Sequence, residues 1–174
     1  MKIKYILLMI IVALFLVACQ SNDSTSPDVN TEDIKALVHD YSTGQIDNAS
    51  ASITGTELIV TTEDGGEEVY PLPEDEFFVS IAPFINQTHP CTYHSLTGCQ
   101  GEMIEEELEV SIADSEGNIV LEDNLTTLAN GFIDFWLPRD ERYQITIQYQ
   151  DKKVEAEFST FSDDATCITT LQLT

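Results

Sequence analysis

Three cysteines and two histidines are the residues of this sequence best suited to chemistry. Cys91 and Cys99 lie eight residues apart in one segment, His89 and His94 belong to the same segment, and Cys167 lies near the C-terminus. Thiolates and imidazoles bind soft or borderline metal ions such as Cu(I) and Zn²⁺. These residues predict a metal site, in which three thiolates would suit the trigonal coordination of Cu(I). Such a site requires a fold that brings Cys167 to the other two cysteines.

Two alternatives use the same residues without a bound metal. Outside the cytoplasm cysteines usually pair, and a Cys91–Cys99 disulfide would leave Cys167 as a buried, unreactive thiol. Cys91 with His94 or His89 could instead act as nucleophile and base. No oxyanion-hole motif or phosphate-binding glycine loop accompanies them, which disfavours a hydrolase. The spacing matches neither a short zinc knuckle nor HExxH, which disfavours structural zinc.

The fourth cysteine, Cys19, follows a segment typical of a bacterial lipoprotein signal. Lys2 and Lys4 precede an apolar run over residues 6–17. That run is too short for a membrane span of about 20 residues. We interpret residues 1–18 as a lipoprotein signal peptide and expect lipid on Cys19 to anchor an extracytoplasmic protein to the cell membrane. An uncleaved N-terminal helix with a chance cysteine is the alternative.

The charge of the chain excludes one class of partner. The full sequence has a formal net charge of −24, and removal of residues 1–18 leaves 5 basic and 31 acidic residues, a charge of −26. Nucleic-acid binding depends on Lys and Arg that neutralise phosphates, so no nucleic acid is expected as a partner. The acidic excess favours solubility and could also attract cations to the surface.

The first part of the mature chain combines a tether, one helix and a few strands. Residues 19–31 carry the lipidated cysteine and are then rich in Ser, Asp, Asn and Thr, which predicts a flexible tether. Residues 32–41 have helical spacing of apolar residues, with Thr31 as the expected N-cap and His39 as a surface or packing residue. From residue 50 the period changes to two, which predicts a hairpin around Asp64-Gly65-Gly66 and a further strand over residues 77–81. We treat residues 32–85 as a small N-terminal α+β part that packs on the rest or on a second copy.

The second part, residues 86–174, is predicted to be a loop followed by a β-sandwich. The loop covers residues 86–102 and holds the four clustered Cys and His residues. Short strands separated by turn signals predict a mostly antiparallel sandwich of the immunoglobulin or transthyretin kind, with Trp136 in its core. The expected strands cover residues 108–113, 119–121, 132–137, 143–149, 154–161 and 167–173. The predicted fold class is therefore α+β.

The metal loop and the C-terminal segments resemble the CueP family of bacterial extracytoplasmic copper-binding proteins. In the loop the resemblance rests on IAPFINQTHPC (residues 81–91), His94-Ser95 and Cys99-Gln100-Gly101-Glu102. Further along it rests on Asn130-Gly131-Phe132, Trp136-Leu137-Pro138, Phe158-Ser159-Thr160 and Thr166-Cys167-Ile168-Thr169-Thr170. It covers about residues 32–174. The lipoprotein signal departs from the plain periplasmic signal of other members.

This resemblance implies a copper site and a set of partners. The ligands and redox thiols would be Cys91, Cys99 and Cys167. His94 would be the best candidate for a further ligand, and His89 the second candidate. The family is associated with copper resistance, with reduction of Cu(II) to Cu(I), with dimers formed through the N-terminal part, and with copper delivery to an exported copper-zinc superoxide dismutase. We therefore expect a copper-binding lipoprotein that carries Cu(I). A surface lipoprotein with a structural disulfide and no metal, and a catalytic thiol protein, remain the alternatives.

Overall fold

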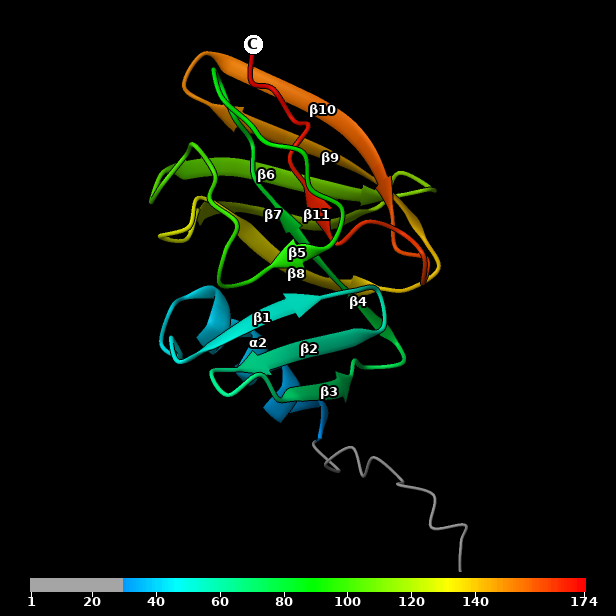
Figure 1. Cartoon of the computed structure of the whole chain (residues 1–174). Coiled ribbons are helices and arrows are strands. Elements are labelled where there is room, and N and C mark those ends of the chain that lie inside the picture. Colours follow the sequence, from blue (N-terminus) through cyan, green and yellow to red (C-terminus); the bar gives the residue numbers. More distant parts are fainter. Residues whose placement is uncertain (1–29) are drawn as a thin grey trace, which may run out of the picture.

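The computed structural model describes residues 30–174, so the predicted signal peptide, Cys19 and almost all of the tether lie outside the described residues (Figure 1). The described chain forms one helix, α2 (Thr31–Ser42), and eleven strands in three sheets. The first sheet has the order β3-β2-β1-β5, formed by β1 (Ala49–Ile53), β2 (Glu57–Thr62), β3 (Glu67–Pro71) and β5 (His94–Ser95). The middle sheet has the order β11-β4-β8, formed by β4 (Glu76–Ile81), β8 (Ile133–Pro138) and β11 (Cys167–Ile168). The last sheet has the order β10-β9-β6-β7, formed by β6 (Glu107–Asp114), β7 (Ile119–Thr126), β9 (Arg142–Tyr149) and β10 (Lys152–Ser159).

Helix α2 covers one face of the first sheet. Ile34, Val38 and Tyr41 are buried in a common core with residues of β1 and β2, because they recur at helical spacing on one side. The N-cap is Asn30, which has extended backbone angles and accepts a hydrogen bond from the Asp33 amide at 3.1 Å. The prediction of Thr31 as N-cap was wrong by one residue, because the Asn30 side chain takes the capping role.

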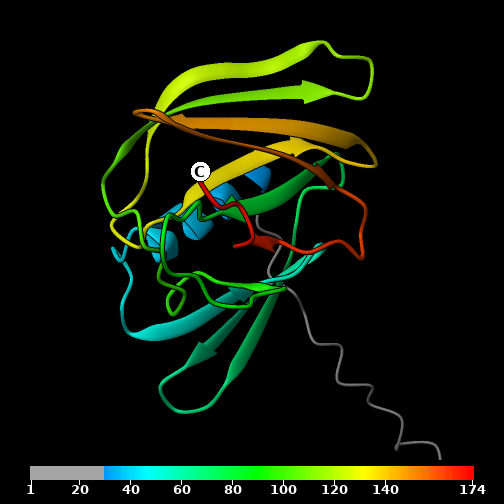
Figure 2. The same ribbon diagram turned by 90° about the horizontal axis from the view of Figure 1, so that it is seen from above.

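The middle sheet lies between two hydrophobic cores. Alternate residues of β4 face opposite ways: Phe77, Val79 and Ile81 belong to the core shared with the last sheet, and Phe78 belongs to the core shared with α2 and the first sheet. Figures 1 and 2 show β1, β2 and β3 on one side of this sheet and β6, β7, β9 and β10 on the other. A strand covered on both faces reads as a continuous apolar run, which explains the Phe-Phe-Val sequence of β4. Trp136 of β8 packs edge-on against Phe78, with ring centroids 5.2 Å apart.

The last sheet is antiparallel throughout and buries only one face. In β6 the buried residues Leu108, Val110 and Ile112 alternate with more exposed ones. The prediction of an α+β protein with mostly antiparallel sheets is confirmed. The immunoglobulin or transthyretin label for the sandwich stays a prediction.

The final strand differs from its prediction. The expected strand over residues 167–173 is reduced to the two residues of β11, which run parallel to β4 with Cys167 beside Ser80. Beyond Ile168 the chain leaves the regular ladder, and its backbone bonds instead to Phe84, which donates to the Leu171 carbonyl and accepts from the Leu173 amide. An isolated bridge between Phe84 and Gln172 marks this contact.

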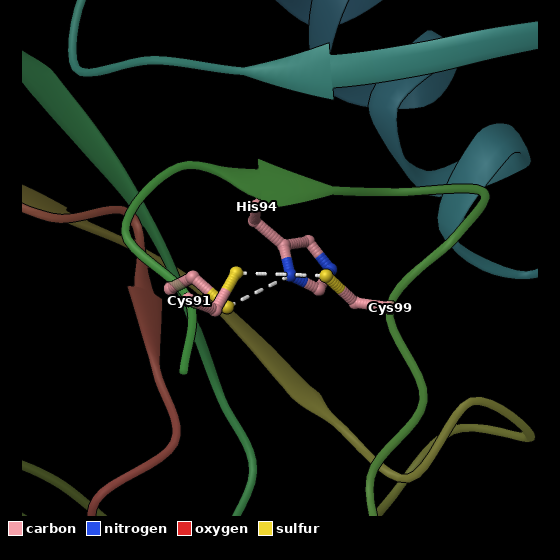
Figure 3. A group of neighbouring side chains, drawn as sticks. Cys91, His94 and Cys99 are labelled. Atoms are coloured by element: carbon pink, nitrogen blue, oxygen red, sulfur yellow. Dashed lines mark hydrogen bonds between the residues drawn. The ribbon is translucent and has the colours of Figure 1, made fainter. Parts of the chain in front are cut away.

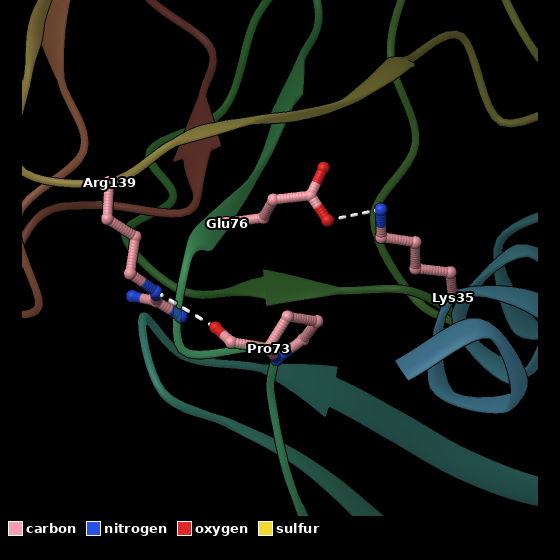
Figure 4. A network of polar contacts seen from close by, with 4 residues as sticks. All are labelled: Lys35, Pro73, Glu76 and Arg139. Carbon is pink, nitrogen blue, oxygen red and sulfur yellow. Dashed lines mark hydrogen bonds and ion pairs between the residues drawn. The ribbon is translucent and has the colours of Figure 1, made fainter. Parts of the chain in front are cut away.

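Several contacts join the two predicted parts across residues 85 and 86. Strand β4 pairs with β8, and β1 pairs with β5. Within the first part, Lys35 of α2 forms an ion pair with Glu76 of β4 (Figure 4). Arg139 donates from Nε to the Pro73 carbonyl at 3.1 Å and from Nη1 to the Gly55 carbonyl at 2.7 Å.

Within residues 30–174, no helix has the length and apolar character needed to cross a membrane.

Candidate metal centre

The loop between β4 and β6 brings two thiols and an imidazole together. The Sγ atoms of Cys91 and Cys99 lie 3.6 Å apart, and His94 lies between the two cysteines along the chain (Figure 3). The backbone of His94 is held in β5, where it pairs with Ile53 of β1. The His94 side chain is fully buried, whereas Cys91 and Cys99 are partly exposed. The loop thus presents these groups at the edge of the first sheet.

Cys167 completes the group from the far end of the chain. Its sulfur lies 3.4 Å from Nδ1 of His94, and its backbone amide donates to the Thr92 carbonyl at 3.1 Å. One ligand atom from each of Cys91, His94, Cys99 and Cys167 lies within 4.8 Å of the other three. The fold therefore brings Cys167 to the loop cysteines, which a shared site requires.

Hydrogen bonds of threonine hydroxyls connect the C-terminal segment to the loop on either side of Cys167. Thr88 Oγ1 donates to the Thr169 carbonyl at 2.5 Å, and Thr169 Oγ1 donates to the His89 carbonyl at 2.6 Å. On the other side, Thr166 Oγ1 accepts a hydrogen bond from the His94 amide at 3.0 Å. These bonds hold together two segments that are more than seventy residues apart in the sequence.

The buried side of the group is apolar. Cys167 is 2% exposed and forms a small core with Ala82 and Phe132, against which Cys91 and Cys99 pack. The His94 ring lies 4.5 Å from the Phe132 ring between centroids. In such surroundings a charged thiolate lacks water, so a cation bound to it would be held strongly. Sequence reasoning did not single out Phe132 as a neighbour of the site.

The thiols differ in acidity because of their contacts with one another. Proximity to Cys167 holds the pKa of the Cys99 thiol well below its usual range, and the nearby imidazoles of His94 and His89 act in the same direction. Proximity to Cys99 raises the pKa of Cys167, and burial adds to that rise. Burial raises the pKa of Cys91. These directions make Cys99 the most acidic of the three thiols.

The spacing of these atoms suits one metal ion better than it suits a disulfide. The thiols of Cys91, Cys99 and Cys167 are all free. Cys167 is buried, as the disulfide alternative also expects, but its sulfur contacts His94 of the cluster. A metal–sulfur bond of roughly 2.3 Å in a trigonal arrangement places sulfur atoms about 4 Å apart, close to the 3.6 Å between Cys91 and Cys99. Nε2 of His94 is buried without a hydrogen-bond partner. The chemistry of the donor set, three sulfurs and an imidazole, therefore fits a soft metal ion.

The remaining candidate residues lie further out. His89 is half-buried beside the cluster, with its ring 6.3 Å from Phe132, but it is not one of the four residues whose ligand atoms converge. It lines a surface pocket with Cys91, Phe84 and Thr169. His39 is exposed on α2, as expected, and lies outside the group. Cys19 lies outside the described residues.

Comparison with known proteins identifies the family. A family model described as periplasmic copper-binding protein CueP matches residues 33–172. The chain belongs to the CueP family. The crystal structure of S.CueP is similar to this chain, with a TM-score of 0.76 and 35% sequence identity over 81% of this chain and 88% of that chain. No curated protein matches. The CueP family is periplasmic and binds copper, and the Cys/His group could hold such an ion.

The unequal acidity of the thiols predicts an order of alkylation. Because thiolates react and thiols do not, Cys99 should react with iodoacetamide at a lower pH than an ordinary cysteine, whose pKa is about 8.5. Cys167, buried and with a raised pKa, should stay unmodified in the folded chain. Mass spectrometry of peptides after short labelling pulses, from about pH 5 to about pH 9, measures both.

The control for this order is Cys167→Ala. Removal of the Cys167 thiol removes the largest cause of the low Cys99 pKa, so the labelling profile of Cys99 should shift to higher pH. A profile that stays unchanged in this variant would contradict the assignment of the low Cys99 pKa to the neighbouring Cys167 thiol.

Proposed function

We propose that this chain is an extracytoplasmic copper-binding lipoprotein that sequesters or delivers copper. In this proposal Cys91, Cys99 and Cys167 hold one Cu(I) ion, with His94 as the further ligand. The convergence of four ligand atoms within 4.8 Å carries the proposal. His89 stands outside that group and is proposed only as an auxiliary ligand at the rim.

The choice of copper over zinc rests on two arguments. Three cysteines and one histidine also form a zinc-binding set, so the donor atoms alone admit both ions. The copper binding of the family favours copper. Three thiolates in apolar surroundings favour the singly charged Cu(I), because thiolates are soft ligands and Cu(I) accepts low coordination numbers.

Sequestration and delivery both require that the ion can enter and leave. Cys167 and His94 are buried, but Cys91 and Cys99 are partly exposed, so an acceptor's ligands could reach the ion from the side of these two cysteines. We propose an exported copper protein, such as a copper-zinc superoxide dismutase, as the acceptor. A homodimer formed through residues 32–85 is part of the same proposal, on the strength of the family resemblance.

The copper proposal predicts about one tightly held Cu(I) per reduced chain. Replacement of Cys91, Cys99 or Cys167 by serine should each weaken binding more than about 100-fold, beyond the loss typical of an outer hydrogen-bond partner. Competition with a chromophoric Cu(I) chelator, under anaerobic and reducing conditions, measures the affinity. The mature chain with Cys19→Ala is the starting protein, since it carries only the three thiols of the site.

Two controls sharpen this test. His94→Ala should weaken Cu(I) binding, whereas His39→Ala, which removes an exposed imidazole on α2, should leave it unchanged. Unchanged Cu(I) affinity in Cys167→Ser would refute the three-thiolate site. Preference for zinc when both ions are offered would refute the choice of metal.

The short Cys91–Cys99 distance favours a second candidate function, reduction of Cu(II). Each of the two thiolates would give up one electron, which forms one disulfide and converts two Cu(II) ions to Cu(I). An outside thiol reductant would have to restore the two thiols before another cycle. Without such a reductant, excess Cu(II) should yield a single burst of about two Cu(I) per chain with the loss of two thiols.

Turnover distinguishes a reductase from a binding protein. Repeated Cu(I) formation with a supplied thiol reductant, lost in Cys91→Ser and kept in Cys167→Ser, would support catalysis by the Cys91–Cys99 pair. A rate equal to that of the reductant alone would rule it out.

The lipid anchor on Cys19 gives a separate prediction. The native chain should fractionate with membranes, because its acyl chains would bury methylene groups in the bilayer. Its mass should include several acyl chains, since a single chain gives only a weak anchor. Cys19→Ser should abolish the lipid mass and release the protein. A chain without lipid that still begins at Met1 would favour the uncleaved helix instead.

A further inference from the structure

The hydroxyl of Thr166 occupies a fully buried position beside the metal centre. Thr166 is 0% exposed and directly precedes Cys167. Its Oγ1 donates to the Ile53 carbonyl at 2.6 Å and accepts from the His94 amide at 3.0 Å. Ile53 and His94 are direct partners in the β1–β5 ladder. One side chain therefore joins the end of that ladder to the start of β11.

These two bonds relate the backbone of His94 to the backbone of Cys167. The His94 imidazole and the Cys167 sulfur are 3.4 Å apart, and both side chains are buried. Strand β5 has only two residues, so its own ladder offers few bonds to fix the orientation of His94. Cys167 is fixed separately, beside Ser80 in the middle sheet. The Thr166 hydroxyl is thus a direct polar link between the strand that carries His94 and the strand that carries Cys167.

We infer that Thr166 is a positioning residue of the copper site, whose hydroxyl sets the distance between the His94 imidazole and the Cys167 sulfur before the metal arrives. This inference rests on the proposed copper function. A site whose ligand atoms are already placed loses less free energy to reorganisation when the ion binds. Removal of a partner outside the ligand shell typically weakens metal affinity about 10- to 100-fold.

A hydroxyl is needed here because volume alone does not satisfy the two backbone groups. Valine has nearly the same shape as threonine but can neither donate nor accept, so the His94 amide and the Ile53 carbonyl would lose this partner in a buried place. The β1–β5 pair would then separate from β11 or admit water, and the His94 ring would move relative to Cys167. Serine keeps the hydroxyl and should keep both bonds.

Thr160 provides a matched control. It is also 0% exposed, and its Oγ1 accepts from the Glu141 amide at 3.1 Å and donates to the Pro138 carbonyl at 2.9 Å. Both of these bonds join it to the turn between β8 and β9, away from the metal centre. Thr160→Val therefore removes a buried hydroxyl that, like that of Thr166, bonds one backbone amide and one backbone carbonyl, but does so outside the site.

The experiment compares Thr166→Val, Thr166→Ser and Thr160→Val in the mature Cys19→Ala chain. Thermal unfolding of the copper-free proteins should show that both valine variants lower the midpoint by similar amounts. Cu(I) affinity, measured by chelator competition, should fall about 10- to 100-fold in Thr166→Val. It should stay within about threefold of the starting protein in Thr166→Ser and Thr160→Val, since their ligand geometry is kept.

Each result bears on a separate claim. Weak or absent Cu(I) binding by the starting protein would refute the proposed function itself. Tight binding there, with equal affinities in Thr166→Val and Thr160→Val, would overturn the positioning role of Thr166.

If Thr166→Val does not fold, Thr166→Ala replaces it, because the smaller side chain leaves room for a bridging water. A loss of Cu(I) affinity of about 10-fold or more in Thr166→Ala, absent in Thr160→Ala, would support the role. Affinity equal to that of the starting protein would overturn it.

Discussion

The hydrogen bonds between residues 88–94 and residues 166–169 are the interactions on which the metal centre depends. The loop alone supplies two cysteines and one histidine, but a loop of this length has many conformations and would lose much entropy to hold one of them. The bonds of Thr88 and Thr169 to the opposite carbonyls, and of Cys167 to the Thr92 carbonyl, fix the loop against a strand of the middle sheet. The third cysteine and the order of the loop therefore come from the same contacts.

The middle sheet decides where these contacts form. Its strand β4 is buried on both faces, so packing constrains it from both sides. Strand β11 pairs with β4 in parallel, and Cys167 falls on the face that turns toward the first sheet, beside Ala82 and Phe132. The site thus lies where the first and middle sheets meet. Its apolar lining is the small cluster of Ala82, Phe132 and Cys167, which is separate from the two larger cores.

Charge explains why this place suits a cation. Neither Lys nor Arg appears among the described hydrogen-bond partners of the cluster, and the few basic side chains of the folded part serve elsewhere. Lys35 pairs with Glu76, and Arg139 donates to the Pro73 carbonyl (Figure 4). Arg139 also donates to the Gly55 carbonyl. Among the described residues, no Lys or Arg is therefore placed to balance the charge of a thiolate in the cluster. A bound copper ion would supply the missing positive charge, and its binding would release the protons held by Cys91 and Cys167.

The sequence by itself determined the fold class, most strand positions and the residue types of the site, because these follow from local periodicity and from the chemistry of thiols and imidazoles. It placed the helix to within a residue at each end, and it gave the candidate ligands together with their soft-metal character. It did not determine that His94 would converge with the cysteines while His89 stayed at the rim, since both histidines lie in one irregular loop without periodicity. Nor did it reveal that β11 would be two residues long and parallel to β4, or that the Thr166 hydroxyl would join it to β5. Only the tertiary structure decided these points, because they depend on pairings between segments far apart in the sequence, which local patterns do not encode.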